Sequence, residues 1–144
     1  MSKHPITCHV LNTITGRPVS NLRCELQKQQ SSSSSSSFAT FGTASTNSDG
    51  RVVFWDLLQS HDSIDHQSNE VFLDQAYVGS KDFSSANDTL YKVKFSGIDE
   101  LFDGDTFFPY VEIVFKIPAG KLGVEHFHIP LLLSKYSYST YRGS

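Results

Sequence analysis

The chain has 144 residues, of which 38% are hydrophobic, and its formal net charge is −3. This size suits a single domain, residues 1–144, with one hydrophobic core. The sequence contains no block of basic residues that would follow a phosphate backbone, which argues against a nucleic-acid partner. We also find no apolar run long enough to span a membrane and no apolar leader segment, so we expect a cytoplasmic protein without a membrane partner.

Short runs of alternating apolar and polar residues recur along the chain, as is typical of strands with one buried face. We expect eight strands, over residues 6–13, 22–29, 38–46, 51–55, 89–95, 110–117, 124–133 and 136–141. One short helix is expected over residues 98–102, where Ile98, Leu101 and Phe102 supply an apolar face. About eight strands with one short helix predict an all-β fold, namely a β-sandwich.

Two segments interrupt this pattern. Residues 31–37 are consecutive serines, which cannot bury enough apolar area to offset the entropy of ordering them, so we expect a loop insertion. Residues 59–88 are mostly polar and form a long connection, in which we expect His61 and His66 to be solvated. Cys8 and Cys24 are expected to be buried, reduced thiols without a catalytic role.

The period of a strand determines which side chains share a face. The apolar side chains of residues 6, 8 and 10 suit the core, which leaves His9 on the opposite face. In the strand over residues 124–133, the large apolar residues at odd positions leave His126 and His128 opposite the core. In the last strand, Tyr141 falls on the face opposite Tyr138. We therefore expect His9, His128 and Tyr141 outside the sandwich interior.

Arg51 directly follows an Asp-Gly pair, which favours a tight turn, so the next strand begins on an arginine. A guanidinium at this position would lie at the end of the sheet. From pattern alone, Arg51 is equally well an exposed hairpin residue.

The two histidines of the segment His126-Phe127-His128 leave several interpretations open. They are compatible with a solvated strand face or with a catalytic site. A third interpretation is a zinc site, because two histidines on one strand face can both bind a metal and His9 could supply a third nitrogen.

Three segments of the sequence resemble one known family. Residues 7–12 read TCHVLN, residues 126–134 read HFHIPLLLS and residues 141–144 read YRGS. Together they are similar to the transthyretin-like 5-hydroxyisourate hydrolases of urate breakdown, which carry related opening, central and C-terminal motifs. The C-terminal match is specific, and the N-terminal match is supportive.

This resemblance implies a transthyretin-like sandwich and an enzyme of purine catabolism that needs no metal or other cofactor. The implied reaction is hydrolysis of 5-hydroxyisourate to 2-oxo-4-hydroxy-4-carboxy-5-ureidoimidazoline. The residues implied as catalytic are His9, Arg51, His128, Tyr141 and Ser144, and the first four of these are also expected to bind the substrate. The resemblance further implies a homotetramer whose active sites lie at the contact between two dimers.

A carrier without catalysis is the alternative function, because transthyretin itself resembles this family and binds small aromatic hormones. A carrier channel would be lined by aliphatic and small residues. This chain instead keeps His9, Arg51 and His128 together with the terminal motif, which favours the hydrolase. The sequence leaves a peroxisomal location open, although residues 142–144 do not match the Ser-Lys-Leu address.

Overall fold

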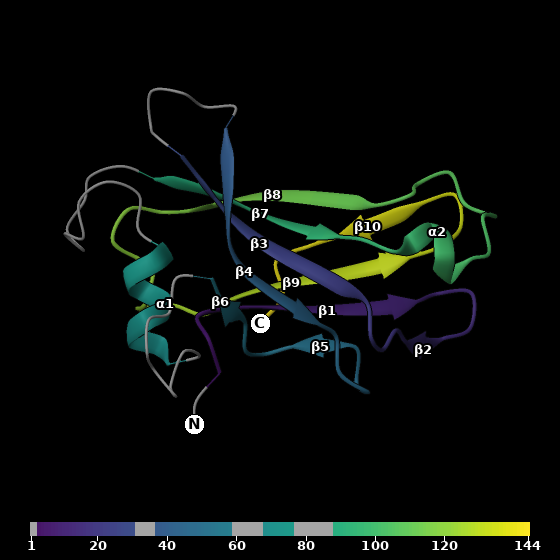
Figure 1. Ribbon diagram of the computed structural model, residues 1–144, viewed down its shortest axis with the longest axis horizontal. Coiled ribbons are helices and arrows are strands. Elements are labelled where there is room, and N and C mark those ends of the chain that lie inside the picture. Colours follow the sequence, from purple (N-terminus) through teal and green to yellow (C-terminus); the bar gives the residue numbers. More distant parts are fainter. Residues whose placement is uncertain (1–2, 31–36, 59–67, 77–87) are drawn as a thin grey trace.

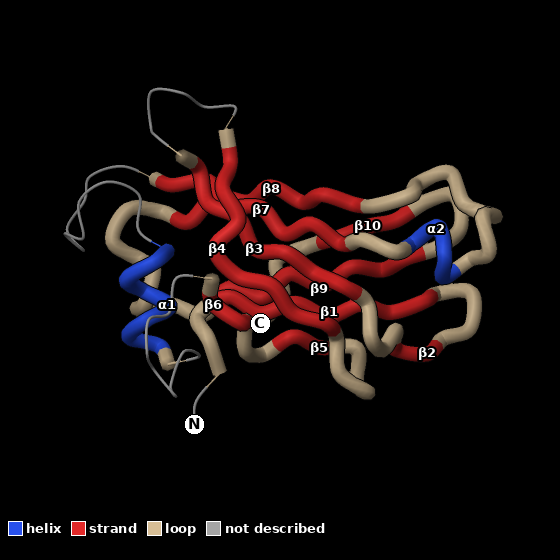
Figure 2. The backbone as a smooth tube through the Cα atoms, viewed as in Figure 1, coloured by secondary structure: helices blue, strands red, loops and turns tan. Residues whose placement is uncertain are grey.

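The computed structural model describes residues 3–30, 37–58, 68–76 and 88–144. Within these ranges the chain forms two packed β-sheets with a helix near each end of the molecule (Figures 1 and 2). The elements in chain order are β1 (Ile6–Asn12), β2 (Arg17–Pro18), β3 (Arg23–Gln29), β4 (Phe38–Ser45), β5 (Arg51–Val52), β6 (Asp56–Leu57), α1 (Asn69–Ala76), β7 (Thr89–Phe95), α2 (Ile98–Leu101), β8 (Val111–Ile117), β9 (Phe127–Leu133) and β10 (Tyr138–Thr140).

Each sheet has a simple order of strands. The first sheet runs β10-β9-β1-β2, and β5 also pairs with β1. The second sheet runs β6-β4-β3-β7-β8. Most of the pairings are antiparallel, but β1 and β9 run parallel along their whole length, which places residues 6–12 beside residues 127–133. The expected all-β sandwich is confirmed.

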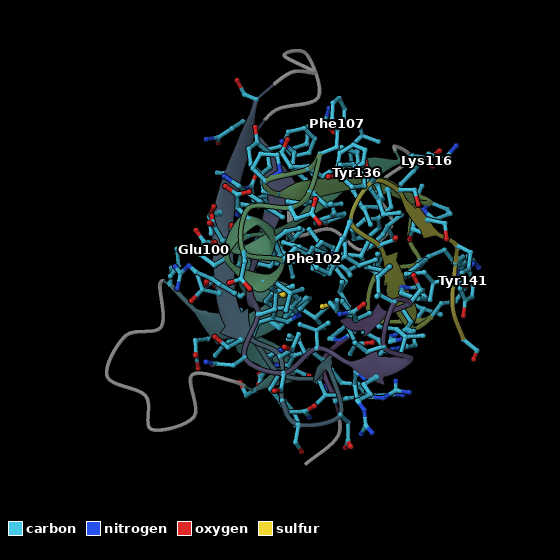
Figure 3. All side chains as sticks on the ribbon, turned by 90° about the vertical axis from the view of Figure 1, so that its right-hand side faces the viewer. Glu100, Phe102, Phe107, Lys116, Tyr136 and Tyr141 are labelled. Carbon is cyan, nitrogen blue, oxygen red and sulfur yellow. The ribbon has the colours of Figure 1, made fainter. Side chains whose placement is uncertain are left out.

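Side chains that alternate along each strand point into the space between the sheets and form the core there. Ile6, Cys8 and Val10 of β1 are fully buried, as predicted. The odd-numbered residues 127–133 of β9 are at most 5% exposed, also as predicted. Cys8 and Cys24 are both buried free thiols, in agreement with the sequence-based expectation. Viewed from one end of the molecule, Phe102 points into this core, whereas Tyr141 lies at the outer surface (Figure 3).

The segment expected as one strand over residues 51–55 is divided between the two sheets. Residues 51–52 form β5 on β1, and residues 56–57 form β6 on β4. Between them, the Val53 carbonyl accepts a hydrogen bond from the His4 backbone N–H, and the Trp55 N–H donates to Nδ1 of His4. His4 therefore provides hydrogen-bond partners for the backbone groups of Val53 and Trp55, where the chain crosses from one sheet to the other. A second difference is the two-residue strand β2, which is too short to show an alternating pattern.

The structure contains a helix that the sequence analysis did not predict. Helix α1 lies within the long connection 59–88, where Phe72, Gln75 and Ala76 are buried at helical spacing. The few apolar residues of this segment give no clear helical period in the sequence. Helix α2 begins at Ile98 as expected and ends one residue early. Neither helix is long and apolar enough to cross a membrane in the part of the chain that is described.

Most residues of the serine run (31–36), together with residues 59–67 and 77–87 of the long connection, lie outside the described ranges. The expectations for the serine loop and for His61 and His66 therefore remain predictions.

Candidate functional site

The parallel pairing of β1 and β9 brings the predicted histidines together on the outer face of the first sheet. In this register Thr7 lies opposite His128, and His9 lies opposite Pro130. The ring centroids of His9 and His128 are 6.4 Å apart. Both residues are half-buried, so each remains partly exposed on the outer side of the sheet.

A tight turn places Arg51 beside His9. The Asn47 side-chain oxygen accepts hydrogen bonds from the backbone N–H groups of Asp49 (2.9 Å) and Arg51 (3.0 Å). Gly50 has a φ of 75°, and a Cβ at this position would lie 2.6 Å from the carbonyl oxygen of Val10. Only glycine therefore allows the turn to approach β1 so closely. As a consequence Arg51 pairs directly with His9 across the strands.

The positive charge of Arg51 acts on both histidines. Burial lowers the pKa of His128 to about 4, with further contributions from Arg51, His126, His9 and Lys3. Burial and Arg51 also lower the pKa of His9, although Asp49 opposes the shift. A low pKa keeps both imidazoles neutral near pH 7, the state in which a ring nitrogen can accept a proton.

A buried hydroxyl connects His128 to a second histidine on the same strand. Thr7 Oγ1 lies 2.7 Å from Nδ1 of His128 and 2.9 Å from Nε2 of His126. Thr7 is only 2% exposed. The hydrogen bond to Nδ1 fixes the orientation of the His128 ring and leaves its Nε2 available for chemistry.

The C-terminal residues continue the pairing of β10 beyond its last strand residue. The Gly143 N–H donates a hydrogen bond of 2.9 Å to the carbonyl oxygen of His128. The Arg142 guanidinium donates to the Glu125 carboxylate (3.0 Å) and to the His126 carbonyl (3.3 Å). These contacts hold the end of the chain against β9. Ser144 directly follows Gly143, the residue that bonds to His128.

Gly143 packs against the ring of His128 so closely that no side chain fits. A Cβ on Gly143 would lie 2.6 Å from Cδ2 of His128 and 3.1 Å from Cγ of Pro130. We predict that Gly143→Ala displaces the His128 ring or the chain end and lowers turnover by on the order of 10²-fold, since small displacements of reacting groups are costly. The melting temperature should change little, because the chain end lies at the surface. Turnover equal to that of the wild type would show that this contact does not position the ring.

Sequence comparison identifies the family. The family model described as Transthyretin, the HIUase/Transthyretin family, matches residues 6–143. The chain belongs to the HIUase/transthyretin family. The match includes the strands that carry His9, Arg51 and His128 and all but the last residue of the terminal motif.

Individual members of the family and related structures are similar over nearly the whole chain. The chain is 32% identical to the probable 5-hydroxyisourate hydrolase of Schizosaccharomyces pombe, over 96% of this chain and 90% of the relative. It resembles the structure of (S)-allantoin synthase (TM-score 0.61, 28% identity), covering 99% of this chain but spanning only 44% of that longer protein. Transthyretin from Sparus aurata has the same fold (TM-score 0.65, 18% identity, 96% of both chains).

In this HIUase/transthyretin family member, three of the predicted site residues lie together, and two others lie exposed at the end of the chain. His9, Arg51 and His128 form one cluster. Tyr141 is 60% exposed and Ser144 is also exposed, so neither is held against the cluster within one protomer.

The sequence pattern gives no role to Thr7, or to Arg142 and Gly143 individually, and His126 enters only beside His128 in the open interpretations of that segment. The strand period does place Thr7 on the same face as His9, and this was the available signal for Thr7. The close contact of Gly143 with His128 depends on the register of β10 against β9, which the sequence pattern does not reveal.

A cavity of about 330 Å³ lies at the edge of this sandwich, next to the candidate site. Its walls come from β8, from β9 and from the chain end, and they are mainly apolar. The lining includes Phe115, Ile129 and Tyr141. His128 also contributes to its wall, so the cavity adjoins the candidate site.

The described residues contain no group of three or more His, Cys, Asp or Glu side chains arranged to hold a metal ion. The groups that the structure places on the outer face are the imidazoles of His9 and His128, the Thr7 hydroxyl and the Arg51 guanidinium. Such groups can accept and donate protons and can stabilise a developing negative charge.

Proposed function

We propose that this chain hydrolyses 5-hydroxyisourate to 2-oxo-4-hydroxy-4-carboxy-5-ureidoimidazoline in urate catabolism, without a metal or other cofactor. The observation that carries the proposal is the cluster of His9, Arg51 and His128 on one sheet face. It is supported by the similarity, over nearly the full chain, to a relative that is named as a probable 5-hydroxyisourate hydrolase.

In this proposal, water attacks a carbonyl of the six-membered ring of the substrate. His128 accepts a proton from that water at Nε2, because Nδ1 already bonds to Thr7. The depressed pKa keeps the ring neutral and therefore able to act as a general base at neutral pH. His9, which is also neutral, faces the same space and assists in binding the substrate and in moving protons.

Arg51 stabilises the charge that develops on the attacked carbonyl oxygen. Its planar guanidinium presents several N–H donors in a fixed geometry, which suits the oxygen atoms of an oxidised purine. Because Arg51 is exposed and pairs with His9, it reaches the space in front of the cluster without the cost of a buried charge. Tyr141 and Ser144 would add hydrogen bonds from the end of the chain.

The assembly proposed for this function is a homotetramer whose active sites lie between two dimers. An outward-facing sheet surface can bind one side of a planar bicyclic molecule but cannot enclose it. A second copy of the same surface, related by a two-fold axis, would form the other wall and exclude water. This arrangement would also bring Tyr141 and Ser144, which are exposed in one protomer, next to bound substrate.

A tag at the C-terminus tests the proposed role of the chain end. We predict that an extension beyond Ser144 lowers kcat/KM by at least about tenfold, because it alters a terminus that lies beside His128 and adds bulk to the proposed site between the two sheet surfaces. The matched control carries the same tag at the N-terminus. Equal activity of the two tagged proteins would remove Ser144 from the site.

The reaction itself is tested by ultraviolet spectroscopy of freshly generated 5-hydroxyisourate, with and without the protein and after treatment with a chelator. We expect the protein to accelerate the decay and the chelator to have no effect. Binding without acceleration would indicate the carrier function instead. Acceleration that the chelator abolishes would indicate a metal held by the histidines.

A further inference from the structure

The Thr7 hydroxyl links two imidazole rings into one hydrogen-bonded chain. Its Oγ1 contacts Nδ1 of His128 at 2.7 Å and Nε2 of His126 at 2.9 Å. Thr7 is almost completely buried, whereas both histidines are half-buried. The hydroxyl is therefore shielded from bulk water while each ring keeps an accessible side.

This geometry restricts the protonation states of the two rings. A hydroxyl carries one proton, so Thr7 can donate to only one of the two nitrogen atoms, and the other nitrogen must donate to Oγ1. In one arrangement His128 donates from Nδ1 to Thr7, and Thr7 donates to Nε2 of His126. The Nε2 of His128 then has a free lone pair and is a base. When both hydrogen bonds are reversed, a neutral His128 carries its proton on Nε2 and is an acid.

We propose that His126, Thr7 and His128 form a proton relay, in which Thr7 is a positioning residue and His126 takes up the charge that the base reaction creates. This inference rests on the proposed function, because it assigns a path to the proton lost by the attacking water. It adds His126 and Thr7 to the residues that serve the reaction.

The proton transfers balance over one turnover. Water loses a proton to Nε2 of His128 as its oxygen bonds to the carbonyl carbon. The Nδ1 proton of His128 moves to Thr7 Oγ1, and the hydroxyl proton of Thr7 moves to Nε2 of His126. When the carbon–nitrogen bond breaks, His128 donates its Nε2 proton to the leaving nitrogen, and the relay reverses. Both histidines are then neutral again.

The surrounding charges favour moving the positive charge away from His128. Besides burial, which is the largest cause, Arg51, His126, His9 and Lys3 all lower the pKa of His128. The pKa of His126 is lowered by burial and by Lys3.

The charges that act on the two rings differ. Arg51 lowers the pKa of His128 but is not among the groups that lower the pKa of His126. A proton on His126 therefore avoids the repulsion from Arg51 that a proton on His128 meets.

The experiment compares Thr7→Val, which keeps the shape but removes the hydroxyl, with Thr7→Ser, which keeps the hydroxyl. We expect Thr7→Val to lower kcat at least about tenfold with little change in KM, and Thr7→Ser to stay close to the wild type. His126→Gln should lower kcat to a similar degree. The Thr7→Val/His126→Gln double variant should be no slower than the slower single variant, because both changes break the same chain.

A second measurement does not depend on turnover. In protein labelled with ¹⁵N-histidine, NMR should show His128 protonated at Nδ1 in the wild type and a shifted tautomer balance in Thr7→Val. An unchanged tautomer, or wild-type kcat in Thr7→Val, would overturn the relay while leaving the hydrolase function intact. A wild-type protein that does not hydrolyse 5-hydroxyisourate would overturn the proposed function itself, and the relay with it.

Discussion

Replacing His128 with asparagine should lower the turnover of 5-hydroxyisourate by on the order of 10²-fold or more, which is the usual cost of losing a general base. The asparagine side chain matches in size the part of the imidazole that is closest to the backbone. It can keep a hydrogen bond to Thr7, which bonds to Nδ1 of His128 in the wild type. It has no atom at the position of Nε2. The loss should therefore appear in kcat, measured by the ultraviolet decay of the substrate.

The controls for His128→Asn separate chemistry from folding. The melting temperature and the oligomeric state should be those of the wild type, since the His128 side chain lies on the outer face and not in the core. His61→Asn is a matched substitution in the long connection, outside the described residues, and should leave turnover unchanged. Near-normal turnover in His128→Asn would refute the assignment of His128 as the base.

Replacing Arg51 should reduce kcat/KM by about 10²-fold to 10³-fold, because the guanidinium is proposed to stabilise charge in the transition state and to bind the substrate oxygens. Arg51→Lys keeps the charge but loses the planar set of donors, and Arg51→Met loses both. We expect both variants to be impaired, with Met the more severe. The matched control is Arg23→Lys, at an exposed strand start in the other sheet. Full activity in Arg51→Met would exclude Arg51 from the site.

The same pair of variants makes a prediction about pH. In the wild type, kcat/KM should fall as the pH decreases through about 4, because the His128 imidazole becomes protonated there and can no longer accept a proton. Arg51 is one of the groups that lower this pKa, so Arg51→Met should raise the pKa and move the acid limb to higher pH. Arg51→Lys retains the positive charge and should move the limb less. An acid limb at the same pH in all three proteins would show that another group controls it.

The outer-face site could be anticipated from the sequence because strand alternation is a local property. The burial of Ile6, Cys8 and Val10 places His9 outside the core, and the same argument holds for His128 on β9. The tight turn before Arg51 was also evident from its Asp-Gly pair. These inferences required only the two-residue period of a strand and the chemistry of a turn.

Contacts between distant segments could not be derived in the same way. The bonds from Thr7 to His126 and His128 depend on the parallel register of β1 and β9, which is set by the whole sheet. The contact of Gly143 with His128 depends on how the chain end continues β10. Helix α1 was missed because its stability comes from packing Phe72 against the body and not from a strong helical pattern.

The central claim is that the substrate binds on the outer face of the β1–β9 pair, in front of His9, Arg51 and His128. A crystal structure of the protein with urate, a stable molecule of similar shape, tests it most directly. The account predicts that the urate oxygens lie within hydrogen-bonding distance of the Arg51 guanidinium, with the ring system next to the His9 and His128 imidazoles. Urate bound instead in the cavity at the sandwich edge, among Phe115, Ile129 and Tyr141, would contradict it.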